Sequence, residues 1–323
     1  MPKFAMACAA LVFLAASARA QDQRSEEVVA NLAEGRVVIC VARDGMDIAA
    51  VSGKGEPGSH APAVVPLSSD HIGILLGAID WVTPDSGAKP VRLDGELQRL
   101  AAQVNQRGPG VRQSGGETND IEALGVALLE RIRQLAGQIH SELKLGENEP
   151  LVRMLYVGFA PDYGPEVWTI DYRVEQESVG DNYWVTRVPR PRYNQLYPPE
   201  KGRPHTLMEV AYPPETGDAA PPDLLALLRS SDPRLLRIRD ANEPFRVAVG
   251  RILDGQSQKS DADVDADFLR TALPVVSDPN AKLSLATFYS EKGFHWVLAP
   301  AEQLPADSKP READAPTLRK KGS

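Results

Sequence analysis

The apolar positions near the amino terminus of the chain fall into short unbroken runs. Two of these runs, residues 37–42 and 46–51, flank an Arg-Asp-Gly turn at 43–45. Asp-Gly between β-rich runs predicts a tight hairpin, because glycine adopts the positive φ of the turn without a Cβ clash. A third run at residues 71–82 is apolar on both faces, which is typical of a strand covered on both sides. The pattern therefore predicts a core sheet built on these runs.

Further elements follow from the helical and strand periodicities along the chain. Leucine and isoleucine at helical spacing predict a long helix over residues 120–143, whose apolar face we expect to cover the strands rather than bind a partner. A capping serine and a terminal glycine predict a short helix over residues 25–34. The other predicted helices are residues 94–106, 223–229, 243–253 and 265–273. The other predicted strands are residues 151–160, 166–174, 183–188, 206–212, 283–290 and 294–299. Surface loops are predicted at residues 51–69, 83–90, 107–117 and 189–205.

Residues 1–20 have the pattern of a secretory signal peptide. Lys3 supplies the positive end, residues 5–16 form the apolar run, and an Ala-Arg-Ala motif at 18–20 suits cleavage. The apolar run is shorter than the roughly 20 residues that cross a bilayer, so we expect removal rather than anchoring. No later segment is long and apolar enough for membrane insertion. The sequence thus predicts a mature chain that begins near Gln21 and is secreted or periplasmic.

Composition limits how the mature chain can be stabilised and what it is expected to bind. Cys40 is its one cysteine, so no intramolecular disulfide can form and stability must come from the core. Residues 21–300 are enough for a single large domain, and the polar, Pro-rich residues 301–323 are expected to be a disordered tail. Without Lys3 and Arg19 the mature chain has 34 basic and 44 acidic residues, a net charge of −10. Such a chain repels phosphate backbones, so nucleic acid is not an expected partner.

The order helix, hairpin, strand, two helices, hairpin, helices, hairpin resembles the proteasome-type branch of the N-terminal nucleophile hydrolases. The likeness covers residues 25–174, and more weakly residues 243–298. It is carried by the first hairpin at 35–51, the strand at 71–82 and the hairpin at 151–174. Within this last hairpin, the triplets Val157-Gly158-Phe159 and Ile170-Asp171-Tyr172 fall where the family places similar ones. The resemblance implies an α/β (α+β) fold, a four-layer αββα sandwich. It also implies a possible homo-oligomer, because that family forms rings.

The catalytic positions of that family are vacant in this chain. Its active members open the first strand with a threonine, serine or cysteine whose own amine serves as the base. The corresponding position is about Gly35, which has no side chain, and signal cleavage would expose Gln21, which is not a nucleophile. The family's aspartate would fall at about Val51 and its lysine within residues 61–65, where no lysine occurs. The chain therefore resembles the non-catalytic proteasome subunits, in which a leading segment covers the nucleophile position, and no catalytic residue is assigned.

Aromatic and basic side chains interleave in residues 183–205, the most unusual stretch in composition. In an acidic protein, such a segment could bind a carboxylate-bearing ligand or an acidic protein partner, with arginine stacking on tyrosine. The alternative is a long crossover loop at 189–205 whose tyrosines pack on the sheet edge and whose arginines balance the protein's own acids, and loop composition favours this interpretation. The residues assigned to the predicted ligand or partner loop are Tyr183, Trp184, Arg187, Arg190, Arg192, Tyr193, Tyr197 and Arg203.

The other chemistry-bearing residues show no site pattern. Cys40 lies in an apolar run, where a thiol behaves as a small hydrophobe rather than a nucleophile. The aspartates of residues 261–267 have the spacing of a calcium loop but lack its glycine and its distal glutamate, so they predict a solvated helix start. None of the five histidines stands three to five residues from another, so no zinc site is expected. No metal and no cofactor are predicted.

Two function classes remain from the sequence. The vacant catalytic positions favour an exported non-catalytic protein that acts in binding or assembly. The alternative is a secreted hydrolase with an unrecognised active site, around residues 183–205 or the histidines. Self-association through sheet or helix surfaces is expected in the first class.

Overall fold

The computed structural model of the chain describes residues 28–53, 60–82, 89–106, 120–139, 141–146, 149–160, 164–180, 184–199, 206–214 and 223–300. The predicted signal peptide, the Gly-rich segment 107–117 and the predicted tail lie outside these residues. The structure mixes helices with antiparallel sheets, so the predicted α+β class is confirmed.

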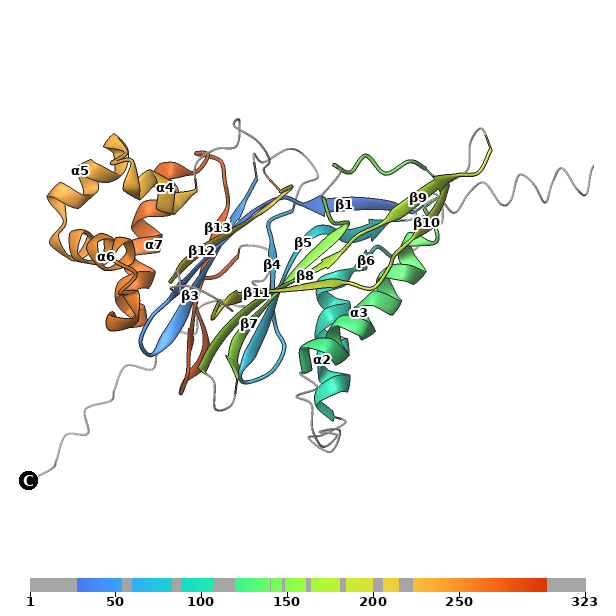
Figure 1. The fold of residues 1–323 in the computed structure, drawn as a ribbon, viewed down its shortest axis with the longest axis horizontal. Coiled ribbons are helices and arrows are strands. Elements are labelled where there is room, and N and C mark those ends of the chain that lie inside the picture. Colours follow the sequence, from blue (N-terminus) through green and yellow to red (C-terminus); the bar gives the residue numbers. More distant parts are fainter. Residues whose placement is uncertain are drawn as a thin grey trace, which may run out of the picture.

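Two antiparallel sheets form the body of the protein (Figure 1). Sheet A contains β1 (Val29–Ala33), β5 (His71–Val82), β7 (Val152–Ala160), β8 (Gly164–Tyr172) and β11 (Arg192–Tyr197) in that order, with β4 (Ala63–Pro66) and β6 (Val91–Arg92) also paired to β5. Sheet B contains β12 (Leu207–Tyr212), β2 (Gly35–Val41), β3 (Gly45–Ser52), β13 (Leu283–Tyr289) and β14 (Gly293–Leu298) in that order. A separate two-stranded ribbon, β9 (Glu175–Ser178) with β10 (Trp184–Arg187), projects beyond sheet A.

Helices cover the outer face of each sheet. The helices on sheet A are α2 (Leu93–Gln106) and α3 (Asp120–Ala136). The helices on sheet B are α4 (Leu224–Arg229), α5 (Pro233–Ala241), α6 (Glu243–Leu253) and α7 (Ala262–Val276). In Figure 1 the two helical groups lie at opposite sides with both sheets between them. The layers therefore follow one another as helices, sheet, sheet, helices.

Three apolar clusters hold these layers together. One joins sheet A to α2 and α3, and another joins sheet B to α4 through α7. The third lies between the sheets, where residues such as Val37, Ile39 and Ile48 of sheet B meet Ile72 and Leu155 of sheet A. Strands that contribute to a cluster on each face need apolar residues at successive positions, which is why the runs at the start of the chain do not alternate.

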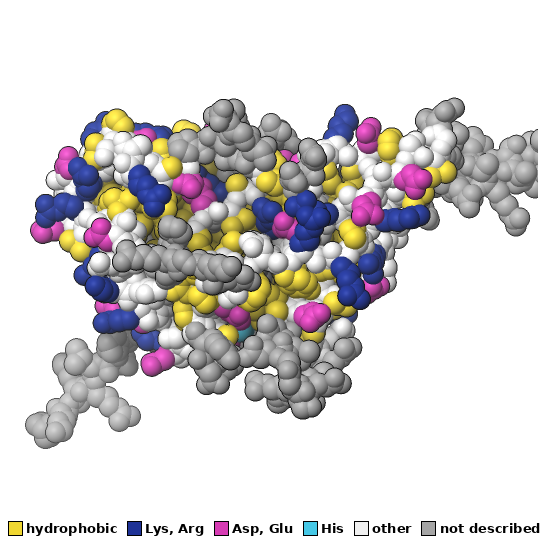
Figure 2. Space-filling model, viewed as in Figure 1, with side chains coloured by type: hydrophobic (Ala, Val, Ile, Leu, Met, Phe, Trp, Pro, Cys, Tyr) yellow, Lys and Arg dark blue, Asp and Glu magenta, His cyan; other side chains and the backbone are white. Residues whose placement is uncertain are grey.

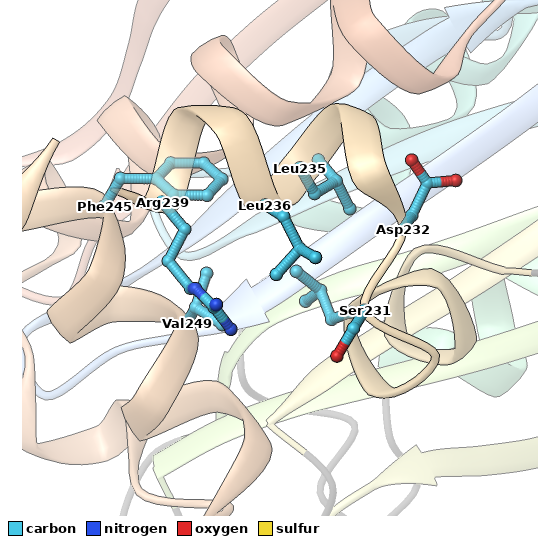
Figure 3. Close-up of a pocket in the computed structure, with 8 residues that line it drawn as sticks. Ser231, Asp232, Leu235, Leu236, Arg239, Phe245 and Val249 are labelled. Carbon is cyan, nitrogen blue, oxygen red and sulfur yellow. The ribbon is translucent and has the colours of Figure 1, made fainter. Parts of the chain in front are cut away.

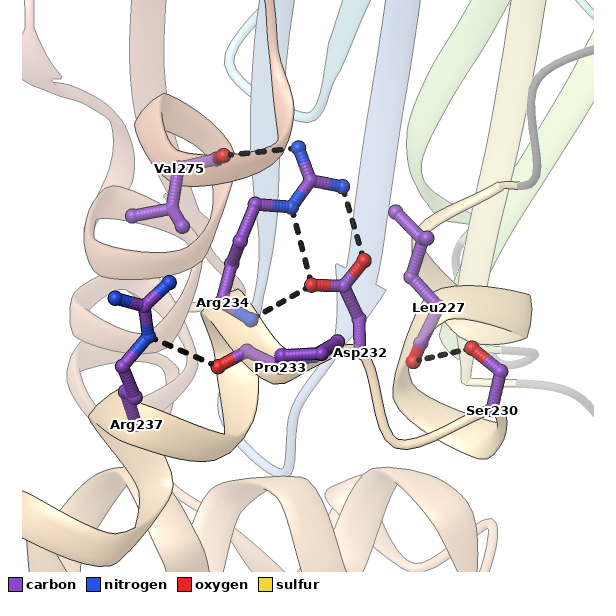
Figure 4. Close-up of polar contacts among 7 residues, drawn as sticks. All are labelled: Leu227, Ser230, Asp232, Pro233, Arg234, Arg237 and Val275. Carbon is purple, nitrogen blue, oxygen red and sulfur yellow. Dashed lines mark hydrogen bonds and ion pairs between the residues drawn. The ribbon is translucent and has the colours of Figure 1, made fainter.

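Hydrogen bonds at the turn between α4 and α5 cap α5 and connect it to α7 (Figure 4). The Asp232 carboxylate caps α5 by accepting from the Arg234 backbone amide at 2.8 Å, and it also accepts from the Arg234 guanidinium at 3.0 Å. That guanidinium donates at 3.3 Å to the Val275 carbonyl at the end of α7. Pro233 at the first helical position suits this start, so α5, which the sequence analysis missed, has a clear local signal.

Several predicted elements differ from the structure. The segment predicted as a helix at 25–34 is extended where it is described, and its residues 29–33 form β1, which pairs with β5. An isolated helix of that length is marginal, so pairing with the edge of a sheet determines the outcome. The predicted loop at 51–69 contains β4, whose three apolar residues are buried against β5.

The long helix and the Pro-, Arg- and Tyr-rich loop also differ from their predicted bounds. α3 ends at Ala136 rather than at residue 143, although Ile139 beyond it is still buried. Residues 192–197 of the predicted loop 189–205 form β11, the outer strand of sheet A. Its apolar and polar residues do not alternate regularly, so the sequence pattern does not predict a strand here. The strand is defined by its pairing with β8.

A buried polar row crosses sheet B beneath α7. Cys40, Asp47 and Thr287 are direct neighbours on β2, β3 and β13, and Asp265 of α7 lies against them. Thr287 Oγ1 donates to Asp47 Oδ1 at 2.6 Å, and Cys40 Sγ donates to Asp265 Oδ2 at 3.4 Å. Both carboxyl groups are fully buried, so the prediction that the aspartates of 261–267 are all solvated is wrong for Asp265.

Burial changes the ionisation of these two carboxyl groups. Desolvation raises the pKa of Asp47 to about 8, although the hydrogen bond from Thr287 partly opposes the rise, and the Asp265 charge adds to it. Desolvation likewise raises the pKa of Asp265 to about 6, against hydrogen bonding from Cys40. Among the described residues, Asp47 Oδ2 and Asp265 Oδ1 have no hydrogen-bond partner, which is tolerable only for a protonated carboxyl.

We expect the free energy of unfolding to fall as pH rises from about 4 to about 8. Both folded-state pKa values lie above their usual value of 3.8, so the native state binds the extra protons and loses their contribution as they dissociate. One such group gives a slope of about 1.4 kcal/mol per pH unit at most. Asp47→Asn, which can still accept from Thr287, should flatten the slope and exceed the native protein in stability above pH 8. Urea unfolding at several pH values measures this slope.

The exposed carboxyl at the end of α6 supplies a matched control. Asp254→Asn removes the same charge outside the buried row and should leave the slope unchanged. A slope equally steep in Asp47→Asn and in the native protein would show that Asp47 is not the group that loses its proton.

Candidate functional site

An ion pair between neighbouring strands marks one end of the sandwich. Arg153 of β7 stands directly opposite Asp171 of β8. The guanidinium donates to both carboxylate oxygens, from Nε to Oδ1 at 2.7 Å and from Nη2 to Oδ2 at 2.8 Å. Its Nη1 donates at 3.3 Å to the Ala211 carbonyl of β12, so the same side chain connects sheet A to sheet B. Bidentate pairs of this kind have a defined geometry, which makes this end of the sandwich a rigid support.

The row of charges continues onto the outer strand of sheet A. Arg192 of β11 is paired in register with Asp171, and Arg173 follows Asp171 by two positions on the same side of the chain. A cavity of about 190 Å³ opens here. We call it the arginine pocket, and its lining residues are Asp171, Arg173, Val174, Glu175, Pro189, Arg190 and Arg192.

The arginine pocket carries an excess of positive charge. With Arg153 behind it, four guanidinium groups face two carboxylates, and both oxygens of Asp171 are already held by Arg153. Arg190 and Arg192 are exposed, and neither forms an ion pair with any residue that the structure describes. Lys and Arg side chains gather with acidic ones beside them in the upper middle of the face shown in Figure 2. An anion could thus replace water at the two exposed arginines without breaking a described ion pair.

The arginine pocket lies at the end of the sandwich where the first strand of sheet B begins. Ala211, which accepts from Arg153, is paired with Arg36, and the next residue of β12, Tyr212, is paired with Gly35. Gly35 has a φ of +145°, and a Cβ there would overlap the carbonyl oxygen of Val51. Position 35 is therefore closed to any side chain.

The structure separates the eight residues of the predicted ligand loop. It brings only Arg190 and Arg192 into the arginine pocket. Trp184 and Arg187 lie on β10, and Tyr183 and Arg203 fall outside the described residues.

The two other tyrosines of the predicted ligand loop have packing roles. The Tyr193 ring lies over Gly125 of α3, where an added Cβ would overlap the tyrosine hydroxyl. Tyr197 is buried between the sheets, and its hydroxyl is hydrogen-bonded to the side-chain amide of Gln258. Both tyrosines thus have packing contacts, with α3 for Tyr193 and between the sheets for Tyr197, rather than on the sheet edge that the alternative interpretation named.

Sequence analysis missed Arg153, Asp171, Arg173 and Glu175. A weak signal was available, because Asp171 and Arg173 are two charged residues that alternate with apolar ones over residues 170–174. Such a pair points to one face of the sheet, and on a covered face it requires partners. The partners come from β7 and β11, so they appear only once the strand register is known.

Other polar clusters and hollows are less suited to a ligand. The His71 ring stacks on Tyr156 with centroids 4.5 Å apart, and its Nε2 lies 2.8 Å from Glu166 Oε1, so both ring contacts are made within the protein. The hollow between α4, α5 and α6 in Figure 3, lined by Leu235 and Phe245 among others, has a volume of about 10 Å³, which is room for one water. In the part of the chain that the structure describes, no three His, Cys, Asp or Glu side chains could hold a metal ion.

Similarity to known proteins does not identify the function of this site. None of the described helices has the length and apolar character needed to cross a membrane. No protein-family model matches the chain, and a search of curated proteins finds no match. The function is therefore inferred from the arginine pocket and from the residues around Gly35.

Proposed function

We propose that the chain is an exported, non-catalytic binding protein with a proteasome-like fold, and that its arginine pocket binds a carboxylate-bearing ligand or an acidic partner segment. The observation that carries the proposal is the arginine pocket itself, in which Arg190 and Arg192 are exposed beside a cavity of about 190 Å³. Two guanidinium groups near each other match the planar, two-oxygen geometry of carboxylates. The lining residues Val174 and Pro189 add an apolar wall.

The order of elements supports the proteasome-like part of the proposal. The chain begins sheet B with the hairpin of β2 and β3 and returns to the same sheet with β13, which pairs with β3. Two helices and the hairpin of β7 and β8 lie between, on the other sheet. Helices cover both outer faces, as the resembled family would require. Export is inferred from the signal pattern of residues 1–20.

The geometry at Gly35 supports the non-catalytic part. The closed position leaves no space for a nucleophile, and Val51 at the family's aspartate position is buried in the apolar cluster under the helices of sheet B. A hydrolase would need another nucleophile with a base beside it. The described imidazoles of His60, His71 and His295 contact carboxylates or a backbone carbonyl, and no described Ser, Thr or Cys side chain donates to any of them.

We expect Arg190→Ala/Arg192→Ala to weaken the binding of carboxylate ligands. Citrate and a hexaglutamate peptide are suitable probes, and titration calorimetry on the mature chain measures their affinity. A charge-assisted hydrogen bond contributes about 1 kcal/mol or more, so loss of both arginines should weaken binding by at least about 30-fold. Affinity for the native arginine pocket should also fall as salt increases, because exposed charges are screened.

The matched control for charge is Arg237→Ala/Arg246→Ala. It removes two exposed arginines of α5 and α6, far from the arginine pocket in the fold, and changes the net charge equally. Its affinity should equal that of the native protein. Equal weakening in both double variants would mean that only net charge matters, and the absence of citrate and peptide binding to the native protein would reject the carboxylate proposal.

The alternative, a secreted hydrolase, makes a distinct prediction. Broad serine, threonine and cysteine hydrolase probes should not label the purified mature protein, because Gly35 cannot carry a nucleophile and Cys40 is buried with a raised pKa. Mass spectrometry of the intact protein measures labelling. Stoichiometric labelling that a single substitution abolishes would overturn the non-catalytic assignment.

A further inference from the structure

Strand β14 is an outer strand of sheet B, with β13 as its only partner strand in the described structure. An outer strand directs the N–H and C=O groups of every second residue away from its sheet, where they can pair with another strand. Most natural edge strands are protected against such pairing by charged side chains, prolines, bulges or short length.

The other described outer strands of sheets A and B carry a charge, lie beside a proline, are short, or are bridged at one end. On β11, Pro191 precedes Arg192, and a bulge interrupts the strand further on. On β12, Glu209 is held in an ion pair with Arg36, and Pro213 follows the strand. Outer strand β1 is bridged at its end by His60, while β4 and β6 have only four and two residues.

β14 lacks charged residues and proline along its whole length. Its sequence from Gly293 to Leu298 is GFHWVL. The side chains of Val297 and Leu298 are among the most exposed large hydrophobic residues described, at 44% and 41%. The register shift between β13 and β14 leaves Val297 as the extra residue of β14, and this bulge places no charge on the free edge.

We propose that β14 pairs with β14 of a second copy of the chain, in an antiparallel arrangement around a twofold axis. A strand with no Lys, Arg, Asp or Glu meets its own copy without like-charge repulsion. Twofold pairing sets the inner face of one strand beside the inner face of the other. Phe294 and Trp296 lie on that inner face, so they would continue the apolar layer between the sheets across the interface.

The small area of the paired surface limits the expected affinity of the dimer. Six residues form a short strand pair, and such an interface falls below the area of standard stable complexes. The dimer is therefore a weak and concentration-dependent one. It does not involve the arginine pocket, so its existence is independent of the proposed ligand binding.

Sedimentation velocity of the mature full chain over about 5–500 µM tests the proposal, since weak dimers dissociate in this range. The native protein is expected to shift from monomer to dimer as concentration rises. Val297→Lys and Leu298→Lys each place a lysine on the edge strand, and lysine is a side chain that protects natural edge strands from pairing. Each variant should raise the dissociation constant of the dimer at least about tenfold. Circular dichroism verifies that the variants remain folded.

Val247→Lys is the matched control, because Val247 is a similarly exposed valine at 41% on α6. It should dimerise like the native protein. A native protein that stays monomeric at every concentration, or a dimer that persists unchanged in both edge variants, overturns the proposal. So does a dimer that forms only after truncation behind Pro300, since residues 301–323 rather than a second copy would then occupy the edge.

Discussion

The packing of the two sheets through their inner faces is the constraint on which the other features depend. The central strands of the inter-sheet cluster also have a second face, and on sheets A and B that face is covered by helices. Polar side chains consequently have few places within the layers. They concentrate at the end of the sandwich, where Arg153 connects β7 to β12 while its charge is matched by Asp171. A charged pocket at this end is a direct result of apolar layers everywhere else.

The row of Cys40, Asp47 and Thr287 is the exception to that separation. It lies under α7 with Asp265, and its carboxyl groups are buried among apolar neighbours. Replacing such a group by a well-packed apolar residue is often neutral or stabilising, so the row is not expected to increase the free energy of unfolding. Its hydrogen bonds do have one clear effect, because the bond from Cys40 to Asp265 matches α7 to a single position along β2.

The sequence predicted the parts of the fold that depend on local signals. The turn at 43–45, the unalternating run at 71–82 and the hairpins of β7 with β8 and of β13 with β14 were all recognised before the structure. Strands β1, β4 and β11 were not, because they are short, weakly patterned and stabilised by partners distant in sequence. The site residues likewise divide into those with a local signal and those that depend on distant partners. Arg190 and Arg192 stood out by composition, but Arg153 and Asp171 gain their meaning only from the register between β7 and β8.

The position of Cys40 has a consequence for the chemical durability of the protein. Its thiol is fully buried, and burial together with the nearby Asp265 and Asp47 carboxyl groups raises its pKa well above the usual value. Thiol oxidation and disulfide exchange both proceed through the thiolate and require access to the sulfur. An accessible thiol at this position would otherwise allow covalent cross-linking between two molecules in the presence of an oxidant. Here burial of the sulfur, with a smaller effect of the carboxyl groups beside it, favours the protonated thiol, so Cys40 stays unreactive for as long as α7 remains packed on sheet B.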